Sequence, residues 1–317
     1  MNYLILGGAG FIGQHLTQAL FKSKERHVGV TVIDNFKTSN KDALEKFKEY
    51  KNLYRFIEAD LTTIDDKEFL KIARKHDKIF HLAGSVGVEN VDRNPAETLF
   101  NNLALANKLI PLFQQLRNRH VTFASTSEIY GEGPFNEEDN ASIGPSSKLR
   151  WGYASAKLTT EFMIRASDFP YTIVRFFNVA GPGQLGDYGM VLPKFVNAAK
   201  SNQDLIVYGT GEQVRSFCHV NDAVEVLIKL SDTSGELFNI GNNSEPIMIK
   251  DLAQKVVALS DSSSQIITKP YQEAFSKHYG DIYKRIPDLK KVHAATGYVP
   301  KYSLDDIIKD MLSSQKF

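Results

Sequence analysis

Short apolar runs alternate with longer amphipathic segments along the chain as far as Asn178. This alternation predicts a parallel β-sheet with helices on both faces, which assigns the chain to the α/β class with a doubly wound sheet. The predicted strands are Tyr3–Leu6, Val28–Ile33, Tyr54–Ile57, Lys78–Leu82, Val121–Ser125 and Tyr171–Phe176. The predicted helices are 11–21, 41–50, 66–75, 96–117 and 151–167.

The regular pattern ends after Asn178, where glycines and a proline at 181–189 predict a long loop of the kind that carries binding groups. Further elements are predicted at about 193–200, 205–208, 221–231 and 237–240, and the tail is irregular. We therefore expect a sheet domain and a smaller, partly interleaved C-terminal domain that binds substrate. Their ranges are 1–177 with about 215–242, and about 178–214 with 243–317.

Composition narrows the function classes. The chain has 317 residues, and 38 Lys and Arg against 37 Asp and Glu leave a net charge of +1, which excludes the strongly basic surface of a nucleic-acid binder. No apolar run reaches the ~18 residues that span a bilayer, so we expect a cytoplasmic protein with no membrane partner. The single Cys218 excludes an internal disulfide and leaves too few thiolates for structural zinc, so no metal is expected.

Three glycines follow the first strand at the point where the first helix begins. Gly7 permits a tight turn, Gly10 lets backbone amides approach a pyrophosphate, and Gly13 lets the helix pack closely on the strand. Asp34 ends the second strand, 21 positions after Gly13, where a carboxylate accepts hydrogen bonds from an adenosine ribose and repels a 2′-phosphate. The pattern predicts a Rossmann-type NAD site.

A second group of residues carries candidate chemistry. Tyr153 and Lys157 lie four positions apart in a helical segment and therefore share one helix face. A nearby ammonium and an oxidised nicotinamide both favour the phenolate, so Tyr153 could act as a base. Thr126, Ser127 and Glu128 follow a predicted strand and emerge at the carboxyl edge of the sheet, where ligands bind in open α/β folds. Taken alone, these residues also fit an ordinary polar turn and helix surface.

Together these motifs resemble the extended short-chain dehydrogenases/reductases that act on nucleotide sugars, a family of epimerases, dehydratases and decarboxylases. The likeness covers nearly the full length of the chain. It implies cofactor contacts at Gly7, Gly10, Phe11, Ile12, Gly13, Asp34, Asn35, Asp60, Leu61, Leu82, Ala83, Gly84, Asn102, Tyr153, Lys157 and Phe176. It implies substrate contacts at Ser85, Thr126, Ser127, Asn178, Arg215, Asp281 and Arg285.

The resemblance also implies a shared first step. Tyr153 takes the proton from a sugar hydroxyl, usually at carbon 4, as hydride passes to NAD. Lys157 lowers the pKa of Tyr153 and holds the nicotinamide ribose, and Thr126 orients the hydroxyl. Arg215 and Asn178 bind the diphosphate of a UDP- or GDP-linked sugar. The family pairs helices such as 96–117 and 151–167 into a homodimer.

Glu128 is the residue that best distinguishes between the possible steps after carbon 4 is oxidised. Thr126-Ser127-Glu128 resembles both the GDP-mannose 4,6-dehydratases, where the glutamate removes the carbon 5 proton, and the UDP-glucuronate decarboxylases, where Ser127 and Glu128 would lie near the uronate carboxylate. Arg150-Trp151 resembles a decarboxylase of lipid A modification and gives the uronate a slight preference, although Trp151 could merely pack at the helix start. Open alternatives are a 4-epimerase, a 4-dehydrogenase that releases the keto sugar, and a non-enzymatic NAD-binding scaffold or sensor.

Overall fold

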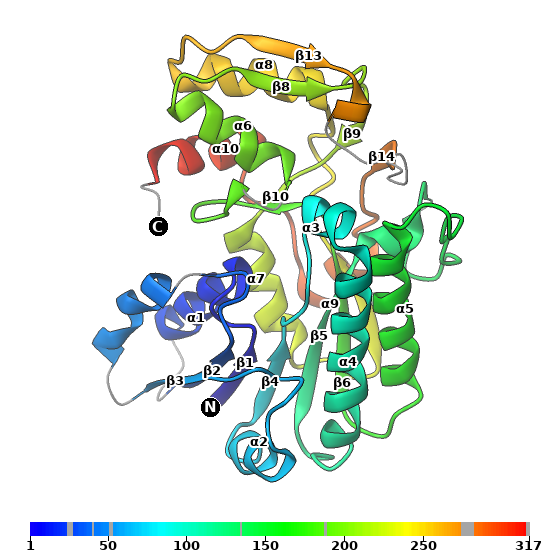
Figure 1. Cartoon of the computed structure of the whole chain (residues 1–317). Helices are drawn as coiled ribbons and strands as arrows, with labels where there is room; N and C mark the ends of the chain where they lie inside the picture. Colours follow the sequence, from blue (N-terminus) through cyan, green and yellow to red (C-terminus); the bar gives the residue numbers. More distant parts are fainter. Residues whose placement is uncertain are drawn as a thin grey trace.

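The computed structural model describes residues 1–23, 28–39, 41–50, 53–133, 135–186, 189–273 and 282–314, except for the side chains of residues 42 and 43. Its largest sheet has seven parallel strands in the order β11-β6-β5-β4-β1-β2-β3 (Figure 1). The strands are β1 (Asn2–Leu6), β2 (Gly29–Asp34), β3 (Tyr54–Glu58), β4 (Lys78–His81), β5 (His120–Thr126), β6 (Tyr171–Phe176) and β11 (Glu236–Ile240). Strand order reverses beside β1, which opens a crevice at the carboxyl ends of β1 and β4.

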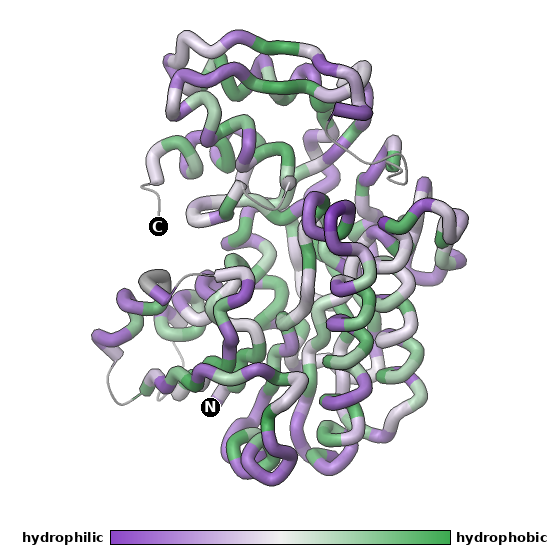
Figure 2. Tube along the Cα trace, viewed as in Figure 1, coloured by the Kyte–Doolittle hydropathy of each residue, from purple (hydrophilic) through white to green (hydrophobic). Residues whose placement is uncertain are grey.

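Helices cover both faces of this sheet and confirm the doubly wound α/β prediction (Figure 1). One face carries α2 (Asp66–Ala73), α4 (Pro95–Phe113) and α5 (Trp151–Arg165), and the other carries α1 (Phe11–Lys22), α7 (Val220–Leu230) and α9 (Lys290–Thr296). Alternate residues of β1 divide between the two cores: Leu4 faces one and Ile5 faces the other. Figure 2 shows hydrophobic and hydrophilic stretches alternating along α4, as expected of a helix that buries one face.

A smaller unit stands over the carboxyl edge of the sheet and has its own core (Figure 1). The core lies among α6 (Val191–Lys200), α8 (Ile249–Ser260) and α10 (Leu304–Ser313), together with β8 (Leu205–Tyr208), which pairs in parallel with β13 (Ile266–Lys269). The remaining elements are the strands β7 (Val179–Ala180), β9 (Val214–Arg215), β10 (Cys218–His219), β12 (Ile247–Met248) and β14 (Lys284–Arg285), and the short helices α3 (Val88–Arg93), η1 (Lys41–Tyr50), η2 (Ser127–Tyr130) and η4 (Tyr271–Glu273).

Three segments differ from the sequence-based expectations. Residues 41–50 form a 3₁₀ helix, η1, in place of an α-helix. Helix α3 was not predicted, because it is a short segment whose one buried residue, Val91, gives no periodicity. In the tail, α8 and β13 are regular, although exposed residues in β13 hide its alternation. The division into two domains at the predicted boundaries stays a prediction.

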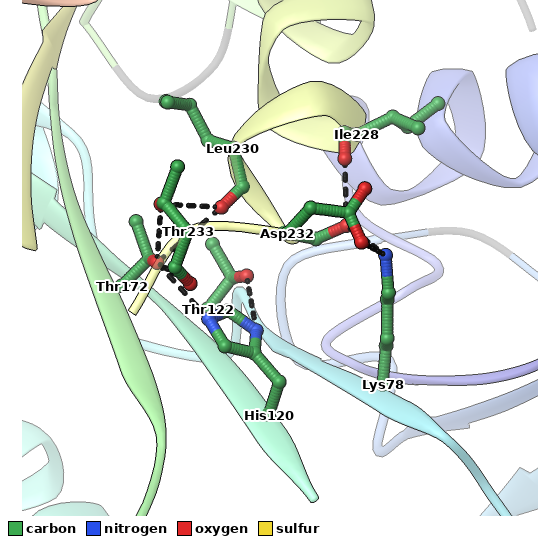
Figure 3. Close-up of polar contacts among 9 residues, drawn as sticks. Lys78, His120, Thr122, Thr172, Ile228, Leu230, Asp232 and Thr233 are labelled. Carbon is green, nitrogen blue, oxygen red and sulfur yellow. Dashed lines mark hydrogen bonds and ion pairs between the residues drawn. The ribbon is translucent and has the colours of Figure 1, made fainter. Parts of the chain in front are cut away.

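Polar contacts bind α7 to the amino edge of the sheet, opposite the crevice (Figure 3). Thr172 Oγ1 lies 3.0 Å from Nε2 of His120 and donates to the Thr233 carbonyl at 2.9 Å. Lys78 Nζ donates to Asp232 Oδ1 at 2.5 Å. Burial lowers the pKa of His120 to about 4, so the ring is neutral near pH 7. Among the described residues, no helix combines the length and apolarity needed to cross a membrane.

Candidate active site

The turn between β1 and α1 is held so close to the exit of β4 that only glycine fits. Gly7 has φ +78°, and a Cβ there would lie 2.6 Å from both Cα and N of Ala83. A Cβ on Gly13 would lie 2.5 Å from Cα of Gly8. Helix α1 begins directly after Gly10, so its free amides face the crevice. This arrangement fits the pyrophosphate of a dinucleotide.

Asp34, at the end of β2, holds the glycine turn from the other side. One carboxylate oxygen accepts from the Ala9 amide at 2.9 Å, and the second accepts from the Phe36 amide at 2.8 Å and from Ser39 Oγ at 3.3 Å. Two carboxylate oxygens offer about four acceptor positions, so Asp34 retains capacity for ribose hydroxyls. Asp60 Oδ2 accepts from Asn35 Nδ2 at 3.0 Å, which fixes the neighbouring wall.

A cavity of about 390 Å³ runs from these residues to Tyr153 and Lys157. The predicted cofactor residues that line it are Gly7, Gly10, Phe11, Ile12, Gly13, Asp34, Asn35, Asp60, Leu61, Leu82, Ala83, Gly84, Tyr153, Lys157 and Phe176. The predicted substrate residues that line it are Ser85, Thr126 and Asn178. Both predicted groups therefore meet in one crevice of a size and chemistry that suit a dinucleotide.

Asn102, predicted as a cofactor contact, lies behind the cavity wall. Its Nδ2 donates to the carbonyls of Ser85 at 2.9 Å and Thr98 at 2.8 Å. A Cβ on Gly84 would lie 2.8 Å from Asn102 Oδ1. Asn102 thus supports the chain where it leaves β4.

Helix α5 brings Tyr153 and Lys157 to the end of β5. Lys157 Nζ donates to the Ala124 carbonyl at 3.0 Å and lies 4.8 Å from the centre of the Phe123 ring. Burial lowers the pKa of Lys157 to about 8, although the charge of Glu161 opposes this.

Burial has the largest effect on the pKa of Tyr153. Burial and then the charge of Glu128 raise the pKa of Tyr153 well above its ordinary value. The groups that act to lower this pKa are Thr126, through a hydrogen bond, and Arg285. The predicted effect of Lys157 and bound NAD on this pKa stays a prediction.

Glu128 lies between two arginines from distant parts of the sequence. Its Oε2 is 3.0 Å from Arg150 Nη2, and its Oε1 is 3.4 Å from Arg285 Nη1. Burial opposes ionisation of Glu128, but Arg150, Arg285 and then Arg215 outweigh it and lower the pKa of the carboxyl. Glu128 is therefore a carboxylate at neutral pH. The side chains of all three paired residues are largely buried, with exposed fractions of 13% for Glu128, 3% for Arg150 and 13% for Arg285.

The other predicted substrate residues that the structure describes do not line the cavity, but Arg285 contacts Asn178, which does. Arg285 Nη2 donates to Asn178 Oδ1 at 2.9 Å, and Asn178 Nδ2 donates to the Ser216 carbonyl at 3.0 Å. Arg215 Nη1 donates to the Tyr283 carbonyl at 3.2 Å. Ser127 is buried with no hydrogen-bond partner for its hydroxyl among the described residues. Asp281 lies outside the described residues.

Sequence reasoning left Arg150 out of the site. The Arg150-Trp151 pair was noticed in the sequence, but no neighbouring residue indicated which of the two side chains points toward Glu128. In the structure the Trp151 ring packs against Gly144, and Arg150 reaches Glu128.

Comparisons with known proteins agree with this geometry. The NAD dependent epimerase/dehydratase family matches residues 3–241. A UDP-N-acetyl-alpha-D-glucosaminuronate decarboxylase of Bacillus cytotoxicus is 36% identical, over 98% of this chain and 96% of that protein. UDP-glucuronic acid decarboxylase 6 of Arabidopsis thaliana is 31% identical, over 96% and 85%. A UDP-glucuronic acid 4-epimerase of Bacillus cereus, solved with UDP-glucuronic acid and NAD, has a TM-score of 0.84 and 25% identity, over 98% of each chain.

The tight glycine turn yields a prediction with a matched control. Gly235 also has positive φ (+77°), but a Cβ there would meet nothing within 4 Å. Gly235→Ala should lower the free energy of unfolding by about 1 kcal/mol, the cost of the backbone conformation alone. Gly7→Ala should cost at least about 2 kcal/mol more, because backbone atoms of Ala83 must move. Urea denaturation measures both, and equal losses would contradict the close approach of β1 and β4.

Proposed function

The chain belongs to the NAD dependent epimerase/dehydratase family, and we propose that it decarboxylates a UDP-linked hexuronic acid after oxidising carbon 4 of the sugar. The observation that carries the choice of a uronate is the contact of Glu128 with both Arg150 and Arg285. Guanidinium groups bind carboxylates through paired, charge-assisted hydrogen bonds, so these two arginines suit the carboxylate of a uronate better than the hydroxymethyl group of a neutral hexose.

Decarboxylation follows from the chemistry of a carbon 4 ketone. The ketone makes the carboxylate on carbon 5 a β-keto acid. When the bond from carbon 5 to the carboxyl carbon breaks, carbon dioxide leaves and the electron pair is delocalised onto the carbon 4 oxygen. A proton then adds to carbon 5. Return of the hydride and of a proton to the carbon 4 carbonyl would restore the hydroxyl group, so that the product is lighter than the substrate by one carbon dioxide. Cationic groups near the carbon 4 oxygen stabilise that charge, and Arg285, within reach of both Glu128 and Asn178, is placed to help.

The chain's own residues divide the remaining work. NAD bound in the cavity supplies the hydride acceptor and a positive charge near Tyr153. The phenolate form of Tyr153, favoured by that positive charge and by a hydrogen bond from Thr126, would accept the proton of the carbon 4 hydroxyl. Lys157 supplies a fixed ammonium beside the cofactor ribose. Glu128, ionised by its arginines, orients them toward the sugar.

The nucleotide is proposed to be UDP, since the similar decarboxylases are named for UDP-sugars. Arg215 and Asn178 are proposed for the diphosphate. Arg285, predicted from sequence as a substrate contact, contacts Glu128, so we propose that it binds the sugar carboxylate.

Product mass tests the reaction. We expect incubation with UDP-glucuronic acid or UDP-N-acetylglucosaminuronic acid to yield a UDP-sugar lighter by one carbon dioxide, and UDP-glucose to remain unconverted. Mass spectrometry separates the alternatives: loss of water indicates dehydration, loss of two hydrogens indicates net oxidation, and unchanged mass with a new retention time indicates epimerisation. Any of these three outcomes without carbon dioxide release would overturn the proposal.

Two variants separate the steps. Tyr153→Phe should abolish both NADH formation and carbon dioxide release while leaving NAD bound, because the phenolic oxygen is the proposed base. Glu128→Gln should still form NADH in a single turnover, but release carbon dioxide at least about tenfold more slowly because the arginines lose their anchor. Absorbance of NADH and trapped labelled carbon dioxide report the two steps. Normal carbon dioxide release by Glu128→Gln would remove Glu128 from the reaction.

A homodimer is also proposed, formed by the outer faces of α4 and α5. These helices lie side by side (Figure 1), and each exposes a phenylalanine: Phe100 is 68% exposed and Phe162 is 64% exposed. Large exposed apolar side chains on adjacent helices are typical of a protein interface.

Charge at these positions tests the interface. Phe100→Glu combined with Phe162→Glu should give a monomer at micromolar concentration, because the two glutamates would be buried unpaired in the dimer. Val299, 59% exposed at another surface, provides the control: Val299→Glu should leave the assembly intact. Sedimentation velocity measures the mass, and a monomeric unmodified protein would refute the dimer.

A further inference from the structure

We propose that Glu161 is a positioning residue for Lys157: its carboxylate keeps the buried ammonium protonated and fixed on the end of β5. This inference rests on the proposed function for its consequence in turnover, but its physical basis is a set of contacts behind the cavity. Glu161 lies four positions after Lys157 on α5, on the same helix face.

Glu161 is held by two donors from the sheet. Arg175 on β6 binds it in a bidentate manner, with Nε 3.0 Å from Oε1 and Nη2 2.6 Å from Oε2. Ser125 Oγ on β5 donates to Oε1 at 2.5 Å. Glu161 is 3% exposed and Arg175 is 5% exposed. A carboxylate held by this many donors and out of contact with water cannot change position easily.

Lys157 is fixed on the adjoining residue of the same strand. Its Nζ donates to the carbonyl of Ala124, next to Ser125. On the other side, a Cβ on Gly84 would lie 3.2 Å from Nζ, so the ammonium is enclosed between β4 and β5. Adjacent residues of β5 therefore hold Lys157 and Glu161 in one arrangement.

The charges around Lys157 give Glu161 its role. Burial lowers the pKa of Lys157 to about 8, and Glu161 is the charge that opposes this effect. His81 on β4 also faces Lys157, but burial and the ammonium lower its pKa to about 3, so it is neutral. Arg175 is paired with Glu161, and Tyr153 is a neutral phenol until it loses its proton. Loss of the Glu161 charge would leave the effect of burial unopposed and lower the proton affinity of Lys157 further.

The same ion pair supports the turn that carries Glu128. The Arg175 guanidinium carbon lies 4.6 Å from the centre of the Tyr130 ring, and Tyr130 is the last residue of η2. Tyr130 Oη donates to Asn239 Oδ1 at 2.9 Å. A purely structural role would act through this packing. A positioning role must also change the proton affinity of Lys157, and that difference decides the test.

The experiment measures the protonation of Lys157 directly. The holoenzyme, labelled with ¹³Cε-lysine, is titrated by NMR, and the Lys157 signal is identified by its loss in Lys157→Met. In Glu161→Gln we expect the proton affinity of Lys157 to fall about tenfold or more, with the alkaline limb of the carbon dioxide release profile moving to lower pH by the same factor. An unchanged Lys157 titration would overturn the proposal, even if activity falls.

Two further variants keep the result interpretable. The double variant Glu161→Gln with Arg175→Gln removes both charges and leaves no unpaired guanidinium. Because Glu161 is the charge that acts on Lys157, the titration of Lys157 should still shift to lower pH in this variant. Glu137→Gln alters another buried carboxylate, which accepts from the Asn239 amide at 2.7 Å, and should leave Lys157 unchanged. If the Lys157 titration also shifted in Glu137→Gln, the effect would come from a general loosening of the protein and not from the charge of Glu161. A shifted titration without any substrate turnover would reject the proposed function alone.

Discussion

The need to keep charges paired away from water governs the carboxyl edge of this sheet. Glu161 binds Arg175, and Glu128 binds Arg150 and Arg285, each within a largely buried setting. Such pairs add little net stability, but removing one partner leaves an uncompensated buried charge. They therefore specify where each side chain stands.

The architecture could be predicted from the sequence because the patterns that indicate it lie within short segments of the chain. Alternating apolar runs and helical periodicity identified the parallel sheet, and the glycines before α1 identified the dinucleotide turn. The partners of Glu128 were not accessible in this way. Arg150 and Arg285 lie far from it in the chain, and only the fold brings them together. Burial, which no local motif reveals, likewise has the largest effect on the pKa of Tyr153.

The small C-terminal unit was the least predictable part of the fold. Its strands are short and exposed, as in β13, so alternation is weak, and its core forms only when α6, α8 and α10 come together. Nevertheless it supplies Arg285 through β14 and thereby completes the surroundings of Glu128.

Helix α5 serves two surfaces at once. Lys157 faces the cavity, Glu161 is buried against the sheet one turn later, and the next residue, Phe162, projects outward. Because one helix carries both surfaces, a substitution on its outer face that shifted the helix axis would also displace Tyr153 and Lys157. The evolutionary freedom of that outer face is therefore limited by the chemistry on the inner one.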